Sequence, residues 1–273
     1  MSTETATLST RPMRTWFPPP FIVNPQTRWV IYIGVIVYLV LAIGSIEVNW
    51  ARMVLGLERG WAFVQGFLAP DFSSRWGDIQ LGFQESLTMT VTSTALGVLL
   101  SLPVAVGASR NLAPTWIYLV CRSFIAASRT LNEIIVAIFL VAMFGFGPFA
   151  GFLTLTFATI GFMAKLMAED IEEIQASQLE ALRATGAGYL QVLDFAVLSQ
   201  VMPRLLGLSL YRLDINFRES AVIGIVGAGG IGATLNTAMD RYEFDSAAAI
   251  LIVIIGIVML AELVSSRLRK FIQ

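Results

Sequence analysis

Seven polar and charged residues lie close together in a largely apolar stretch, at about residues 204–226. A charged group at membrane depth is costly and usually faces a partner or a water-filled cavity. Asp214 and Arg218 are four residues apart and can pair on one helix face. Arg212 and Asn216 have the same spacing. The seven residues are Tyr211, Arg212, Asp214, Asn216, Arg218, Glu219 and Ser220.

This polar segment has two interpretations. In one, the charged groups pair with each other and fix the positions of the helices. In the other, arginines line a path for an oxygen-rich anion, because the planar guanidinium donates paired hydrogen bonds to such oxygens. Two arginines from another apolar stretch would contribute to the same path. The four arginines are Arg122, Arg129, Arg212 and Arg218.

The residues that most enzymes need are absent or isolated. The chain has no histidine, which is the commonest general base and a common metal ligand, and Cys121 is its single cysteine. Its lysines are Lys165 and Lys270, and neither belongs to a G-x-x-x-x-G-K-[ST] phosphate-binding motif. We therefore predict no catalytic residue, no metal site and no cofactor in this chain. A net charge of -1 and the lack of a basic patch give no indication of nucleic-acid binding.

The composition is typical of a helical membrane protein. Hydrophobic residues make up 56% of the chain, charged residues 14%, and the mean hydropathy is +0.73. Several apolar runs reach the roughly 20 residues that cross a hydrocarbon core. We predict an all-α integral membrane fold with six transmembrane helices, at about residues 29–48, 83–106, 115–144, 149–167, 204–226 and 246–265.

Two of these spans have distinctive patterns. The second carries four small residues at helical spacing, which favour tight packing by another helix over a pore lining. They are Thr90, Thr94, Gly97 and Ser101. The third is too long and too polar in its middle for one plain helix. Within it, Arg129 and Glu133 are four residues apart, a spacing that predicts that they can pair on one helix face.

Charge and composition also divide the chain. Residues 1–28 are predicted to be a cytoplasmic tail, 29–82 a first transmembrane helix with an outer interfacial segment rich in tryptophan, and 83–266 the core. Residues 267–273 form a second cytoplasmic tail. Basic residues favour this orientation, with both termini inside, over a five-span alternative. A cleaved signal peptide is disfavoured, because the first apolar run is too long and no small-residue cleavage site follows it.

A polar hairpin is predicted at about residues 169–203, between two apolar spans. Its first helix would begin with acidic residues, which suit a helix N-terminus. Gly186 stands where that helix should end in the left-handed conformation. A second helix would run over 189–200, followed by the fifth span. The acidic residues are Glu169, Asp170, Glu172 and Glu173, and the apolar side of the second helix comprises Leu190, Leu193, Val197 and Val201.

Residues 227–232 match the dinucleotide motif G-x-G-x-x-G letter for letter. That motif needs a preceding strand and a βαβ unit, whereas here the preceding segment is a predicted membrane helix. The glycines instead indicate irregular backbone at the outer mouth of a pathway, which a membrane protein tolerates only against protein or water. They are Gly227, Gly229, Gly230 and Gly232.

The hairpin also carries a family resemblance. Glu180-Ala181-Leu182-x-x-x-Gly186, with Leu198 and a following proline, resembles the E-A-A loop of ABC importer permeases. The segments 184–187, 203–204, 210–212 and 224–232 resemble permease subunits of phosphonate importers, and the resemblance covers about residues 80–270. The sequence departs from the family pattern at two positions: Leu182 replaces an alanine, and Ser199 replaces a proline.

The resemblance implies a type I ABC importer-like permease fold in which the hairpin seats in a separate ATPase subunit. The implied partners are two ATPase copies, which hold ATP and Mg, a periplasmic or lipid-anchored binding protein, and a second permease copy. The implied substrate is phosphonate, phosphite or phosphate, moved through a bacterial inner membrane by alternating access. The implied outer gate is the glycine segment. Residues implied in ATPase coupling are Glu180, Ala181, Arg183, Gly186 and Gly188.

Two alternatives remain. One is an ABC permease for another small solute such as methionine. The other is an ion-coupled secondary transporter or a channel. Ion-coupled carriers often show broken helices at corresponding positions of two repeated halves, and this sequence has no such symmetry.

Overall fold

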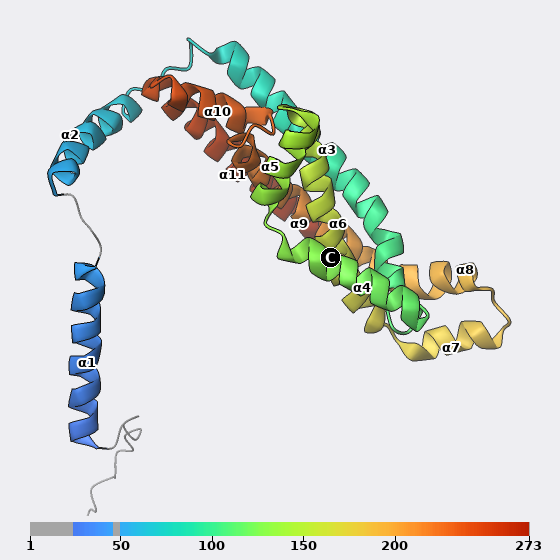
Figure 1. Ribbon diagram of the computed structural model, residues 1–273. Helices are drawn as coiled ribbons and strands as arrows, with labels where there is room; N and C mark the ends of the chain where they lie inside the picture. The colour runs from blue at the N-terminus through green and yellow to red at the C-terminus, as the bar shows by residue number, and fades with distance from the viewer. Residues whose placement is uncertain (1–23, 46–49, 273) are drawn as a thin grey trace, which may run out of the picture. The chain divides into compact units, whose positions relative to one another are not determined.

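The computed structural model describes residues 24–45 and 50–272, and all regular elements in these ranges are helices (Figure 1). The chain divides into two units, Met1–Arg59 and Gly60–Gln273, which we describe separately. The predicted tail falls largely outside the described residues, as does the end of the first predicted span.

The first unit contains α1, Pro25–Gly44, and the start of α2, Trp50–Phe67. The Asn24 side chain accepts a hydrogen bond from the Gln26 amide at 3.1 Å, and Pro25 occupies the first turn, where its missing N–H costs nothing. None of the α1 side chains is buried. With 20 mostly apolar residues, α1 has the length and composition of a transmembrane helix.

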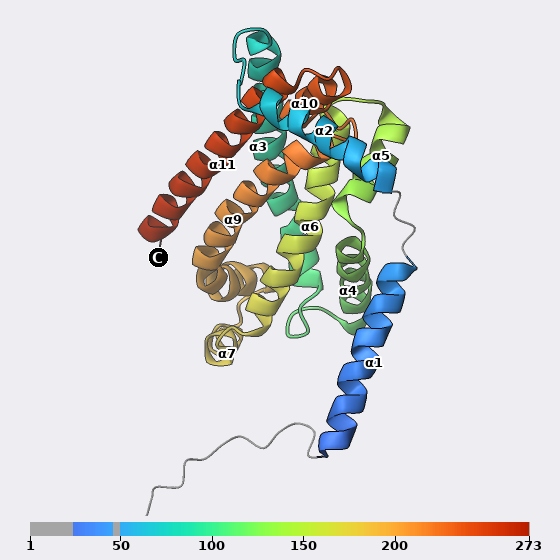
Figure 2. The ribbon, with the colours of Figure 1, turned by 90° about the vertical axis from the view of Figure 1, so that its left-hand side faces the viewer.

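Four long helices form the body of the second unit: α3, Trp76–Gly107; α6, Pro148–Glu172; α9, Ser199–Gly224; and α11, Phe244–Ile272. The helices α3, α6 and α9 pack against one another, and α11 packs against α9 (Figure 2). In the described residues, five helices have the length and composition to cross a membrane, and a bent pair can supply a sixth span.

The small-residue stripe of α3 is buried, as predicted for tight packing. It faces α6, and the closest approach is at Gly97, where an added Cβ would lie 2.5 Å from the Thr159 side chain. Three other members of the stripe, Thr90, Thr94 and Ser101, are at most 5% exposed. The Thr94 and Ser101 hydroxyls donate to carbonyls of α3 itself, and the small size of these residues lets the helices meet.

The third predicted span is a broken helix. The helix α4, Thr115–Thr130, ends at an extended residue, Leu131, and α5, Glu133–Phe144, starts with Asn132 as its N-cap. The two axes differ by 93°. The sequence prediction that one plain helix cannot fill this stretch is therefore confirmed.

At one end of the bundle the chain forms the predicted hairpin from α7, Ala176–Ala184, and α8, Tyr189–Val192, which runs through a π-helical turn, Leu193–Leu198, into α9 (Figure 1). Apolar side chains of this hairpin pack into one cluster with the ends of α3 and α6. Leu190 was predicted to share that side but is 75% exposed, because Val192 and Ala196 take the buried positions instead.

The acidic residues predicted to open the hairpin lie instead at the C-terminal end of α6, which continues to Glu172. A helix C-terminus disfavours negative charge. Three ion pairs offset that effect: Lys165–Glu169, Arg204–Asp170 and Arg122–Glu172.

A further helix lies between the fifth and sixth predicted spans. The helix α10, Gly230–Asp240, packs against α3, α9 and α11 at the end of the bundle opposite the hairpin (Figure 1). Nearby, Arg75 before α3 bonds to Glu243 before α11 at 2.5 Å, and Phe63 of α2 packs on Phe244.

Candidate functional site

A buried hydrogen-bond network joins three helices near the middle of the bundle. Asn216 on α9 donates to the hydroxyl of Thr94 on α3 at 2.8 Å and to that of Thr159 on α6 at 2.9 Å. The Thr159 hydroxyl also accepts from Nε of Arg212 at 3.2 Å. Arg212 and Asn216 thus both bond to Thr159, in place of the direct pair that their spacing allowed.

Arg212 is the most heavily engaged charged residue in this region. Its Nη2 lies 3.1 Å from a carboxylate oxygen of Glu133 on α5 and 3.2 Å from one of Glu219 on α9. The arginine side chain is only 3% exposed, whereas the glutamates are 30% and 23% exposed. One buried cation therefore holds two carboxylates that are more accessible than itself.

The predicted Arg129–Glu133 pair is wrong. The break between α4 and α5 falls between these residues, so the four-residue spacing no longer places them on one helix face. Instead, the guanidinium carbon of Arg129 lies 5.7 Å from the ring centre of Phe162, and that of Arg212 lies 5.3 Å from the same ring. Two arginines from different helices thus share one aromatic platform, a favourable arrangement for guanidinium groups.

These groups line a polar cavity of about 300 Å³. Its charged lining residues carry two positive and two negative charges, which sum to zero. Within the described part of the chain, both ion pairs of this cavity are made by Arg212, and Arg129 has no carboxylate partner. The lining residues are Ser128, Arg129, Leu131, Glu133, Val136, Thr154, Phe157, Ala158, Phe162, Arg212, Ile215 and Glu219.

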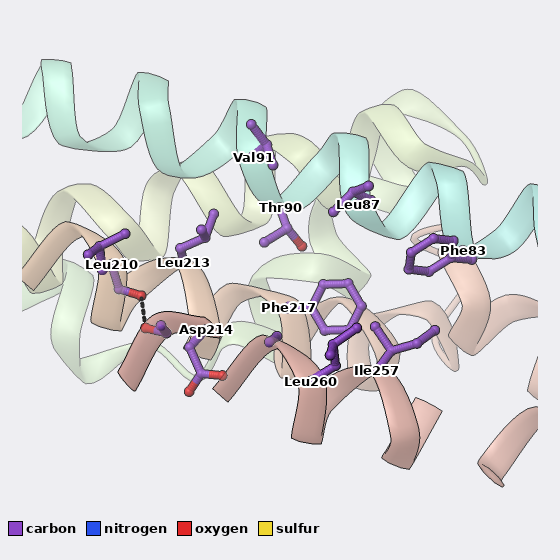
Figure 3. A pocket seen from close by; sticks show the side chains of 12 residues that line it. Phe83, Leu87, Thr90, Val91, Leu210, Leu213, Asp214, Phe217, Ile257 and Leu260 are labelled. Atoms are coloured by element: carbon purple, nitrogen blue, oxygen red, sulfur yellow. Dashed lines mark hydrogen bonds between the residues drawn. The ribbon is translucent and has the colours of Figure 1, made fainter. Parts of the chain in front are cut away.

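Two other predicted charged residues of α9 lie outside this cavity. Asp214 and Arg218 form the predicted pair, with 2.6 Å between Oδ2 and Nη2. Asp214 lies at an apolar pocket of about 270 Å³ between α3, α9 and α11, where Figure 3 shows it apart from Thr90 and Phe217. Arg218, whose side chain is 50% exposed, lines neither pocket.

Arg122 lies outside the cavity as well. It bonds to the Ala108 carbonyl at 2.9 Å and to Glu172 at 3.0 Å, where α3 and α6 end. Of the four predicted pathway arginines, the cavity therefore brings together Arg129 and Arg212. The Tyr211 ring lies 6.2 Å from that of Phe162, behind the lining.

The hairpin presents the predicted coupling residues on its surface. Leu179 is buried and Leu182 packs against the same apolar cluster, and this contact turns the opposite side of α7 outward. Gly186 has φ of 80°, the left-handed conformation predicted from the sequence, and nothing lies within 4 Å of the position a Cβ would take. The exposed residues include Glu180, Ala181, Arg183, Gly186 and Gly188.

The glycine segment at the opposite end is irregular, as predicted. Gly227, Gly229 and Gly230 all have positive φ, at 91°, 76° and 75°. Gly230 then starts α10, and its amide donates to the Glu85 carboxylate on α3 at 2.9 Å. The segment borders a cavity of about 510 Å³ that also includes Phe146.

Gly232 has a different role from its neighbours. It lies inside α10 with ordinary helical dihedrals, and an added Cβ would lie 1.9 Å from the Ala221 carbonyl oxygen on α9. Gly232 therefore allows α9 and α10 to pack backbone to backbone.

Sequence reasoning did not anticipate the contacts of four residues in the polar cavity and the adjoining hydrogen-bond network. Glu133 was named, but as a partner of Arg129. Thr159 and Phe162 lie in an apolar span where one threonine or phenylalanine carries no distinguishing signal. Thr94 belonged to the small-residue stripe, yet its hydrogen bond to Asn216 joins residues 122 positions apart and could not be anticipated.

Comparisons with known proteins identify relatives of this chain. Residues 97–273 match the family model described as the binding-protein-dependent transport system inner membrane component. The putative phosphite transport system permease protein HtxC of Stutzerimonas stutzeri is 37% identical over 83% of this chain and 80% of its own length. The phosphite transport system permease protein PtxC of the same organism is 41% identical over 74% of each chain.

The fold also matches solved structures. A chain of the MetNI methionine ABC transporter, solved in inward-facing conformations, superposes with a TM-score of 0.62. The match covers 70% of this chain and 94% of that one, at 24% identity, so it bears on fold alone. The predicted fold, that of a type I ABC importer permease, is confirmed.

Proposed function

Because this chain belongs to the family of binding-protein-dependent transport system inner membrane components, we propose that it is the permease subunit of an ATP-driven importer for a phosphorus oxyanion. The observation that carries the substrate class is its identity of 37% and 41% to permeases named for phosphite transport. Phosphite, phosphonate and phosphate all present tetrahedral oxygens. Such groups match the guanidinium fork that Arg129 and Arg212 offer at the cavity.

The cavity supplies what an anion needs inside a membrane. An oxyanion that leaves water loses its hydration and must find replacement donors. Arg129 and Arg212 supply charge and N–H groups, and Ser128 and Thr154 add hydroxyls to the lining. In this proposal the oxyanion passes this cavity on its way in. Arg122, Asp214 and Arg218 then serve to position helices, since their contacts lie outside it.

The hairpin provides the proposed connection to ATP. The exposed surface of α7 and the turn at Gly186 would seat in an ATPase subunit, two copies of which serve a pair of permeases. ATP and Mg would be held there, because the chain lacks a phosphate-binding loop of its own. Closure of the ATPases would move the hairpins, and the rigid packing of the hairpin against α3 and α6 would carry that motion into the bundle.

In this arrangement the hairpin end faces the cytoplasm and the α10 end faces outward, in a bacterial inner membrane with both termini inside. The glycine segment next to α10 would form the outer gate. A periplasmic or lipid-anchored binding protein would deliver the oxyanion there, and a second copy of this permease would complete the path.

Uptake measurements test the proposal. Cells that express this chain with its ATPase and binding protein are expected to accumulate labelled phosphite, phosphonate or phosphate, and cells without the chain are not. Accumulation of methionine instead would assign the other solute class. Accumulation that follows an ion gradient and persists without the ATPase would contradict the proposal entirely.

A purification experiment tests the assignment of ATP to the partner. The chain freed of its ATPase is expected neither to bind nor to hydrolyse ATP. Hydrolysis that survives complete removal of the ATPase would show that the nucleotide acts on the permease itself.

A further inference from the structure

The inference concerns the carboxylates at Arg212 and depends on the proposed function. We propose that Glu133 is an internal competitor for the transported oxyanion: it holds the Arg212 guanidinium when the cavity is empty and gives it up when the oxyanion arrives. Its release would break the ion pair that joins α5 to α9.

The first support is the relative exposure of the three side chains. The Arg212 side chain is 3% exposed, yet it belongs to the cavity lining, and the two carboxylates that hold it are 30% and 23% exposed. An anion inside the cavity therefore meets the carboxylates before it meets the cation. To bind Nη2 of Arg212 it has to take the place of at least one of them.

The second support is chemical equivalence. A carboxylate and a phosphorus oxyanion accept hydrogen bonds from the same nitrogens with the same fork geometry. Both hydrogens of Arg212 Nη2 are directed to carboxylates, one to Glu133 and one to Glu219. An exchange of one acceptor for the other keeps the buried cation paired throughout, which avoids the cost of an unpaired buried charge.

The third support is Arg129. It faces the same cavity without a carboxylate partner among the described residues, and it shares the Phe162 ring with Arg212. An oxyanion that has displaced Glu133 would thus lie near a second guanidinium. With Glu133 displaced from the cavity, Arg129, Arg212 and Glu219 leave one net positive charge there, which one negative charge of the oxyanion neutralises.

The choice of Glu133 over Glu219 follows from the helices they belong to. Glu219 is on α9, seven residues from Arg212, so loss of that contact separates nothing. Glu133 is the first residue of α5, directly after the 93° break, and its bond to Arg212 joins α5 to α9. Displacement of Glu133 removes this charged link at the one bend in the third span.

The experiment uses the full-length chain purified with its ATPase, and phosphite as the probe. Thermal unfolding is followed as phosphite replaces chloride at constant ionic strength. Competition predicts that Glu133→Gln lowers the half-saturating phosphite concentration by about tenfold or more, because a nearby negative charge is removed. The matched control is Glu243→Gln, which removes a carboxylate bonded to an arginine outside the cavity and leaves that concentration unchanged.

A second pair of variants separates competition from mere stabilisation of the fold. Glu133→Asp keeps the charge on a shorter side chain and is expected to strengthen phosphite binding by less than Glu133→Gln does. Adding Arg212→Lys to Glu133→Gln should remove most of the gain, because an ammonium cannot present the fork. If Glu133→Gln lowers the melting temperature but leaves the half-saturating concentration at the wild-type value, Glu133 is a structural residue and the inference fails.

The two proposals fail in different measurements. If wild-type cells import none of the phosphorus oxyanions, the proposed function is wrong. If they import phosphite but Glu133→Gln binds it no more tightly, the function stands and the competition is wrong. If the Glu133→Gln protein cannot be purified in a folded state, Glu133→Asp is compared with the wild type instead. Unchanged phosphite binding by Glu133→Asp would then contradict the inference.

Discussion

The hydrogen bonds at the turn of the hairpin join residues close in sequence, whereas those that shape the polar cavity join residues far apart. Gly186 donates to the Arg183 carbonyl, and Gly188 donates to the Gln191 side chain, each three residues away. In the cavity, Arg212 reaches Glu133 over 79 residues and Asn216 reaches Thr94 over 122. The turn of the hairpin can therefore change locally without disturbing the bundle, whereas a change in the cavity affects several helices at once.

The largest expected effect tests the cavity at its central cation. Arg212→Gln leaves Glu133 and Glu219 close together without a positive charge, and breaking such a buried group is expected to cost about 3–5 kcal/mol of unfolding free energy. Folded yield and melting temperature measure it. Arg183→Gln on the exposed hairpin should change stability by less than about 0.5 kcal/mol. Equal losses of unfolding free energy for the two variants would show that the cavity and the hairpin do not differ in this way.

Arg212→Lys refines this first test. It keeps the charge, so the folded yield should stay near that of the wild type, while phosphite uptake falls by about tenfold because paired donation is lost. Uptake equal to the wild type would show that charge alone suffices at this position.

The second prediction concerns the Asp214–Arg218 ion pair, whose two residues are four positions apart on α9. Arg218→Gln leaves the buried Asp214 carboxylate without its partner and should destabilise the protein by about 1–3 kcal/mol. The double variant Asp214→Asn with Arg218→Gln should restore both folded yield and uptake, because neither residue lines the cavity. Restored folding with lost uptake would instead assign Arg218 to the path.

The third prediction tests the hairpin. Gly186→Val forces a β-branched residue into the left-handed region, at a cost of about 1–2 kcal/mol confined to the turn. The permease should insert and fold but lose ATPase binding or coupled uptake. The control is Gly207→Val, which also meets nothing within 4 Å but lies inside α9 with ordinary helical dihedrals. Coupled uptake at the wild-type level in Gly186→Val would show that the hairpin is not needed for coupling.

The smallest effect is expected at a half-buried ion pair that belongs to neither region. The Arg75 guanidinium holds the pKa of Glu243 below its ordinary value of about 4.3. The pair therefore contributes fully at neutral pH, and its contribution is lost as the pH falls through the lowered pKa. The melting-temperature difference between wild type and Glu243→Gln should be small at pH 7 and vanish in strong acid. A melting-temperature difference that grows as the pH falls would contradict the lowered pKa of Glu243.

Short-range features of this protein were predictable because their causes lie within a few residues. Gly186 was expected to adopt positive φ because glycine does so without a Cβ penalty. Asp214 and Arg218 were expected to pair because a helix places residues four apart side by side. The small-residue stripe on α3 indicated close packing for the same reason, and the six apolar segments followed from the thickness of a membrane.

These local rules gave wrong predictions where a helix ends at a different residue from the one expected. The acidic residues suited a helix start, but α6 continues through them, and arginines and a lysine from three elements make its charged end tolerable. The Arg129–Glu133 spacing was valid for a continuous helix, and the break at Leu131 and Asn132 cancelled it.

The sequence by itself determined the membrane class, the approximate spans, the hairpin and the family resemblance, because hydrophobicity and local backbone preference are properties of short segments. The tertiary structure decided which charges meet. Arg212 and Arg218 lie on one helix and look alike in sequence, yet one is buried between two carboxylates at a polar cavity and the other is half exposed. Their surroundings depend on how α5, α6 and α9 pack, and packing is set by contacts between distant segments that no local pattern records.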